Sequence, residues 1–258
     1  SRLLSGDFVH DYMGTIRGSY GVGNSPLSGF KHFEKNVFKG EFPFVQIELK
    51  DSVFPAEVVL EAFNPFIPSN DRDSSIPAAF FNITIKNTSD KKIKYTVLGT
   101  LSNLLNNGGL NRYAEENGIK MITLNGAADK NREDNITIAT DAESTAHQDY
   151  WFRGGWFDTL TMFMNELNRE GQISKRVYDN ENPKGTGDAA TLTASVELKP
   201  GEIKTVKFLI GWYVPYFHVV PKDWWALSKE RDLRNYYSVL FGSSVNTAKY
   251  CFDEWERL

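Results

Sequence analysis

The chain contains 258 residues and carries a formal net charge of −4, with 29 Lys and Arg against 33 Asp and Glu. Hydrophobic residues make up 41% and charged residues 24% of the chain, which excludes an intrinsically disordered protein. The single cysteine excludes a disulfide framework and a Cys-rich zinc module. The mild acidity argues against a general nucleic-acid binder, and the chain lacks the run of about 18 uncharged apolar residues that a transmembrane helix needs.

Aromatic residues account for 14% of the chain, with 18 Phe, 11 Tyr and 6 Trp. Such rings fit half-buried pleated surfaces, which favours a sheet-rich fold in which most of them are core. Residues Ser1–Phe8 lack the apolar run of a signal peptide, and the chain does not begin with methionine. We therefore expect a soluble protein, either cytoplasmic or exported after removal of an earlier signal, and we expect no cofactor.

The first predicted strands lie at residues 44–49 and 56–63, where apolar residues alternate with polar ones or form a short apolar run. The segment 64–77 follows and contains Pro65, Pro68 and Pro77. Because proline removes a backbone donor and biases the preceding residue toward an extended shape, this segment can be neither a central strand nor a helix. The sequence predicts a long ordered loop here.

Two β-hairpins are predicted next. Residues 79–87 and 93–99 alternate on either side of a polar turn, and residues 191–198 and 205–214 flank a second turn. The second turn contains Pro200 followed by Gly201, the residues that a type II turn favours at its two central positions. The first pair places five apolar residues on one shared face, namely Ile83, Ile85, Ile93, Tyr95 and Val97.

Two further strands are predicted at residues 118–124 and 135–141, and two helices at residues 158–170 and 244–258. The sequence therefore predicts an all-β fold, a large two-sheet antiparallel β-sandwich of the supersandwich kind, with one or two short helices and a C-terminal helix. We assign residues 1–240 to the sandwich domain. Residues 241–258 are assigned to the C-terminal helix and to the start of a linker toward a further domain.

No convincing catalytic or metal-binding set is present in the sequence. The four histidines are scattered, and His147 beside Asp149 could bind metal only on a turn. The segment 71–75 resembles the opening of a calcium loop but has Ile76 where such a loop has glycine and Asn82 where it has glutamate. Paired carboxylates, as glycosidase chemistry requires, lie only in polar, loop-like settings. We predict neither catalytic nor metal-ligating residues.

Residues 59–68 (VLEAFNPFIP) and 73–84 (DSSIPAAFFNIT) resemble the N-terminal domain of the non-lysosomal glucosylceramidase (bile-acid β-glucosidase) family, glycoside hydrolase family 116. Residues 41–44 and 211–213 also resemble family positions, and the resemblance covers about residues 40–258. It implies an N-terminal sandwich followed by a helical (α/α)6 barrel that carries both catalytic carboxylates of a retaining β-glucosidase. This chain is then a non-catalytic accessory domain that is inactive alone.

Under this interpretation the partner is the helical catalytic domain of the same protein, and the loop 64–77 and the terminal helix face it. The predicted interface residues are Phe66, Ile67, Asp73, Trp224, Trp225, Phe252 and Trp255. The alternative is a free-standing carbohydrate-binding sandwich, in which Tyr150, Trp151 and Trp156 stack on sugar rings. A third reading, a free-standing enzyme, requires that the chain alone hydrolyses a β-glucoside, and we expect that it does not.

Overall fold

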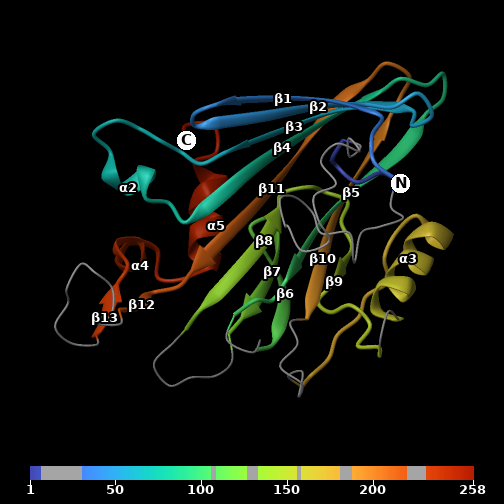
Figure 1. The fold of residues 1–258 in the computed structure, drawn as a ribbon. Coiled ribbons are helices and arrows are strands. Elements are labelled where there is room, and N and C mark those ends of the chain that lie inside the picture. The colour runs from blue at the N-terminus through green and yellow to red at the C-terminus, as the bar shows by residue number, and fades with distance from the viewer. Residues whose placement is uncertain (7–30, 106–108, 127–132, 156–157, 181–187, 220–230) are drawn as a thin grey trace, which may run out of the picture.

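The computed structural model describes residues 1–6, 31–105, 109–126, 133–155, 158–180, 188–219 and 231–258. These residues form two layers of antiparallel β-sheet, which confirms the predicted all-β sandwich (Figure 1). The larger layer is an eight-stranded sheet in the order β1-β2-β3-β4-β11-β8-β7-β6. Its strands are β1 (Lys35–Glu41), β2 (Phe44–Lys50), β3 (Ala56–Phe63), β4 (Ala78–Asn87), β6 (Asn111–Glu116), β7 (Ile119–Asn125), β8 (Asn135–Thr140) and β11 (Ile203–Tyr213).

The smaller layer is a three-stranded sheet in the order β5-β10-β9, with β5 at Ile93–Ser102, β10 at Ala189–Leu198 and β9 at His147–Gln148. A core of buried apolar residues from both layers includes Ile83 of β4, Val97 of β5 and Leu192 of β10. Helix α3 (Asp158–Glu170) lies beside the smaller sheet in Figure 1. A separate pair of short strands, β12 (Tyr216–Val219) and β13 (Arg231–Arg234), precedes the C-terminal helices.

A second core lies on the outer face of the large sheet, beneath the C-terminal helices α4 (Tyr236–Phe241) and α5 (Ser244–Asp253). Successive residues of a strand point to opposite faces, so β4 sends Phe80 to this outer core and Ile83 to the core between the sheets. Helix α5 crosses β11, β8 and β7. It contributes the buried residues Ala248 and Cys251 to this outer core.

Neither predicted hairpin exists as a pair of bonded strands, and this part of the prediction is wrong. Strand β4 pairs with β3 and β11, whereas β5 pairs with β10. The turns at residues 88–92 and 199–202 therefore carry the chain from one layer to the other. The five apolar residues predicted to share one face instead lie on two facing sheets, where all five contribute to the core between the layers. Alternation shows which face is buried and leaves the bonding partner open.

Asn87 joins the two turns at this end of the sandwich. Its backbone N–H donates to Glu202 O and its carbonyl accepts from Gly201 N, both at 3.0 Å. Its buried side chain donates to Leu198 O at 3.0 Å and to Lys91 O at 2.7 Å. Gly201 has a φ of 74°, as the predicted type II turn requires at this position.

Other predicted elements agree closely with the structure. The strand predicted at residues 56–63 and the helix predicted at residues 158–170 are found with the same bounds as β3 and α3. The segment 64–77 is a loop, but it contains one helical turn, α2 (Asp71–Ser74), which the proline argument had excluded. The turn fits between Pro68 and Pro77, where Asn70 caps it by accepting a hydrogen bond from Asp73 N.

Helix α5 ends before the predicted bound. Ser243 caps its N-terminus by accepting from Asn246 N, and the helix ends at Asp253, so residues 254–257 form turns instead of a further helical stretch. None of the helices in the described ranges is both long and apolar enough to cross a lipid bilayer.

Candidate functional site

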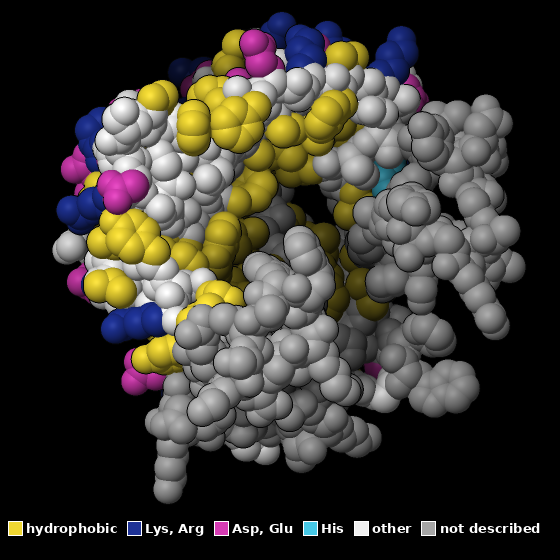
Figure 2. Space-filling view, turned by 60° about the vertical axis from the view of Figure 1, so that its left-hand side comes forward, with side chains coloured by type: hydrophobic (Ala, Val, Ile, Leu, Met, Phe, Trp, Pro, Cys, Tyr) yellow, Lys and Arg dark blue, Asp and Glu magenta, His cyan; other side chains and the backbone are white. Residues whose placement is uncertain are grey.

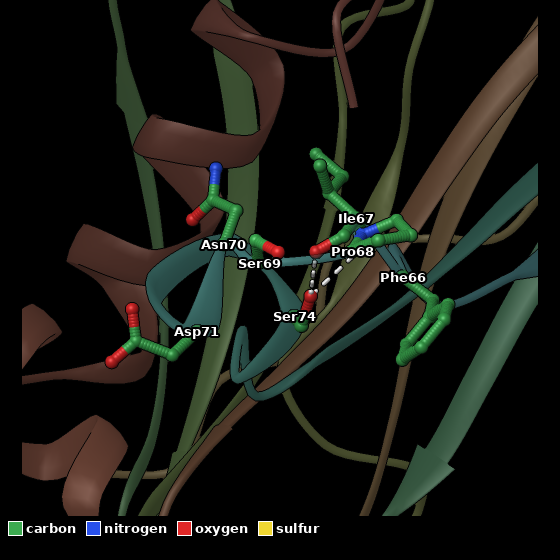
Figure 3. Close-up of a pocket in the computed structure, with 7 residues that line it drawn as sticks. All are labelled: Phe66, Ile67, Pro68, Ser69, Asn70, Asp71 and Ser74. Carbon is green, nitrogen blue, oxygen red and sulfur yellow. Dashed lines mark hydrogen bonds between the residues drawn. The ribbon is translucent and has the colours of Figure 1, made fainter.

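The loop 64–77 projects beside the C-terminal helices and is braced from within. Ser74 Oγ accepts from Ile67 N and donates to Ile67 O, both at 3.0 Å. Asn64 Nδ2 donates to Ala78 O at 2.7 Å, which ties the start of the loop to its end. The loop lines a shallow hollow of about 330 Å³, and Figure 3 shows Phe66 and Asp71 at opposite sides of it. Ile67 is half-buried, whereas Phe66 is 55% exposed.

Asp73 ties this loop to the C-terminal end of the chain. Its carboxylate accepts from Tyr250 Oη at 2.7 Å, from Arg257 Nη1 at 2.7 Å and from Asn70 Nδ2 at 2.7 Å. The Asp73 side chain is 4% exposed, whereas Arg257 is 47% exposed. We call the set Asp73, Tyr250 and Arg257 the loop–helix latch, because it joins α2 to α5 and the turns that follow.

The latch makes stability depend on pH. Hydrogen bonding from Arg257, Tyr250 and Asn70 lowers the pKa of Asp73, despite the opposing effect of burial. Because the folded pKa lies below the unfolded value of about 3.9, the stabilisation is present above that value and is lost as pH falls through the folded pKa. We expect Asp73→Asn to cost about 1–2 kcal/mol at pH 7 and progressively less below pH of about 4, measured by urea unfolding at several pH values.

Asp90→Asn serves as the matched control, because Asp90 lies exposed in the turn between β4 and β5. Its unfolding free energy is expected to follow the wild-type curve within about 0.5 kcal/mol. A pH dependence of Asp73→Asn that ran parallel to the wild type down to pH 3 would contradict the latch.

Exposed phenylalanines gather where the β1–β2 turn meets the start of the loop. Phe42, Phe44 and Phe66 are 78%, 57% and 55% exposed, and we call these three residues the aromatic patch. Phe42 meets Phe66 edge to face with ring centroids 5.2 Å apart, and Phe44 lies 5.6 Å from Phe63. Sequence reasoning found Phe66 but missed Phe42 and Phe44. The sequence Glu41-Phe42-Pro43-Phe44 could have indicated them, because it places two large apolar side chains at a tight turn, where side chains are usually exposed.

The predicted residues of the terminal helix lie behind this patch. Trp255 is 6% exposed and packs 4.8 Å from Phe80, and Phe252 stacks on Trp255 at 5.1 Å. Trp255 and Asp73 are therefore engaged within this domain, and Phe252 is half-buried. Trp224 and Trp225 lie outside the described residues.

The three residues of the carbohydrate-binding alternative differ in their surroundings. Tyr150 is fully buried, and its hydroxyl accepts from Asn111 N at 2.7 Å, so its ring has no face for a sugar. Trp151 is half-buried; one face stacks on Phe163 at 4.1 Å and its indole N–H donates to Thr191. Trp156 lies outside the described residues. Of the two described rings, Trp151 is therefore the one with a partly exposed surface that a sugar could contact.

Several other ionisable side chains form structural pairs. His147 Nδ1 lies 2.7 Å from Asp149 Oδ1, and the imidazole stacks on Tyr113. Arg153 bonds both oxygens of Asp188. Within the described ranges, no three His, Cys, Asp or Glu side chains lie together in a way that could hold a metal ion. Cationic hydrogen-bond partners lower the pKa of Asp51, Asp73 and Glu48, which is the opposite of what a general acid requires.

The fold is an all-β sandwich with C-terminal helices packed on its outer face. A fold of this class does not by itself determine a function, which depends on the particular residues of a site. The sequence pattern of the family described as "beta-glucosidase 2, glycosyl-hydrolase family 116 N-term" matches residues 9–258. The chain belongs to this family. A search of curated proteins gave no match.

Several solved structures share a weak likeness with the chain. A galactose mutarotase related enzyme from Lactobacillus acidophilus is 10% identical, with 69% of this chain and 71% of that one covered and a TM-score of 0.33. A protein assigned as a kojibiose phosphorylase from the human microbiome is 10% identical, with a TM-score of 0.37. The match covers 66% of this chain but only 18% of the phosphorylase. At these TM-scores the likenesses assign no function to this chain.

Proposed function

We propose that this chain is the N-terminal supporting domain of a β-glucosidase and performs no catalysis itself. The family to which it belongs is defined as the N-terminal part of glycosyl-hydrolase family 116 proteins. Its role is to stabilise and orient a helical catalytic domain that acts on β-glucosides. The observation that carries the proposal is the C-terminal helix α5, which is packed on the outer face of the large sheet and latched to the loop 64–77.

The latch and the outer core give the end of the chain a fixed position. Trp255 is buried against Phe80, and Leu258 packs against the same core. A domain that follows Leu258 would therefore leave the sandwich at a defined place and direction instead of on a flexible tether. Fixed exit geometry is what a supporting domain needs, because it limits the orientations that the following domain can adopt.

The test uses aryl β-glucoside hydrolysis and thermal unfolding. The 258-residue chain alone is expected to show no hydrolysis, and the catalytic portion of the same protein is expected to unfold at a lower temperature without it than with it. Hydrolysis by the chain alone, or an unchanged unfolding temperature, would overturn the proposal. Saturable binding of glucosides to the chain that is lost in Trp151→Ala would instead support the carbohydrate-binding alternative.

A further inference from the structure

The three rings of the aromatic patch are far more exposed than the rings of the two cores. Phe33 and Phe80 are 1% and 0% exposed, whereas Phe42, Phe44 and Phe66 together expose on the order of 300–400 Å² of mostly apolar surface. Figure 2, which brings the left-hand side of Figure 1 forward, shows hydrophobic side chains gathered on this side of the molecule. The largest apolar patch on a typical monomeric protein is about 300–600 Å² and often serves a function.

The patch is held in place from behind. Phe44 lies against Phe63, which stacks on Phe80 at 4.7 Å and meets Trp255 at 6.4 Å. Phe66 follows Pro65 and precedes Ile67, whose backbone is fixed by Ser74. Rings that are already held lose little conformational entropy when a partner covers them.

We propose that the aromatic patch is the surface on which the catalytic domain of the same protein docks. This inference rests on the supporting role proposed above and adds the surface through which that role is exercised. The matching surface of the catalytic domain is apolar, because a buried phenylalanine leaves no partner for a charged or polar side chain.

The position of the C-terminus selects a tethered occupant over a partner from solution. Trp255 contacts Phe63 directly behind the patch, Leu258 packs on the same core, and Figure 1 places the C-terminus beside the ends of β1 and β2. Stable association of free proteins buries about 1,200–2,000 Å² in total, which is more than three rings provide. A domain of the same chain meets the patch within one molecule, so a small surface is enough.

Cysteine footprinting tests the proposal on the full-length protein. Phe42→Cys, Phe44→Cys and Phe66→Cys are each labelled with a maleimide, in the 258-residue chain and in the full-length protein, and read by peptide mass spectrometry. Cys251 is fully buried, and burial raises the pKa of its thiol, so it contributes little background. Val53→Cys is the matched control, because Val53 is 76% exposed in the turn at the opposite end of β2 and β3.

We expect the three patch positions to label at least tenfold more slowly in the full-length protein than in the 258-residue chain, with Val53→Cys labelled equally in both. Equal rates at the patch, with the catalytic portion still less stable without this chain, would overturn the docking surface and leave the supporting role intact. Equal rates together with unchanged stability would overturn both. Thermal unfolding of each variant checks that it is folded, as the exposure of the replaced side chains leads us to expect.

Discussion

Replacing Phe80 with alanine is expected to lower the free energy of unfolding by about 3–5 kcal/mol. The ring is fully buried between Phe63 and Trp255, with centroid distances of 4.7 and 4.8 Å. Truncation removes these contacts and leaves a cavity between the large sheet and the residues that follow α5, which neighbouring rings fill only in part. Urea unfolding followed by far-UV circular dichroism measures the loss.

Phe44→Ala is the matched control for this experiment. Phe44 belongs to the same aromatic cluster and contacts Phe63, but it is 57% exposed. Its truncation is expected to cost less than about 1 kcal/mol, because most of its ring is already in water. Losses of equal size in the two variants would show that Phe80 is not part of a packed core between sheet and helix.

The second large effect is expected at Asn87, where the chain crosses between the layers. Asn87→Ala should lower the free energy of unfolding by about 2–3 kcal/mol, because it leaves the buried carbonyl of Leu198 without its partner. The same change removes the acceptor of Ser89 N and one of the two acceptors of the Tyr95 hydroxyl, which keeps Pro55 O at 2.6 Å. Urea unfolding again provides the measurement.

Thr205→Val is the control, because Thr205 lies exposed on β11 and its hydroxyl bonds that of Thr84 at 2.8 Å. Loss of this surface hydrogen bond in a strand that favours valine is expected to change stability by no more than about 0.5 kcal/mol. If Asn87→Ala were equally mild, the buried hydrogen bonds at the crossing would not stabilise the sandwich.

Local patterns in the sequence were sufficient to place most strands and the two longer helices. Strand β3 and helix α3 have the predicted bounds, because alternation and the capping pattern are local properties of the chain. Pairing is not local. Residues 79–87 and 93–99 look like a hairpin, yet their hydrogen-bond partners lie in two different sheets, and nothing in the two segments distinguishes a turn within a sheet from a turn between sheets.

The candidate site was predictable in part. Proline content singled out the loop 64–77, and with it Phe66, but Phe42 reaches that loop only through the register of β1, β2 and β3. The loop–helix latch could not be predicted from local patterns either, because Asp73 and Tyr250 are 177 residues apart in sequence. Contacts of this kind depend on the packing of α5 against the sheet, which the sequence of either segment alone does not encode.

The place of β11 at the centre of the large sheet has a consequence for the order of events during synthesis. Strands β1 to β4 can pair with one another as they leave the ribosome, but β4 keeps an open edge until β11 arrives to bond both β4 and β8. The hydrogen bond from Asn87 to Leu198 O also forms late, because Leu198 lies 111 residues further along the chain. Long-range pairing of this kind folds slowly and leaves strand edges exposed to aggregation. The edge of β4 therefore has no partner in this sheet while residues 88–202 are being made.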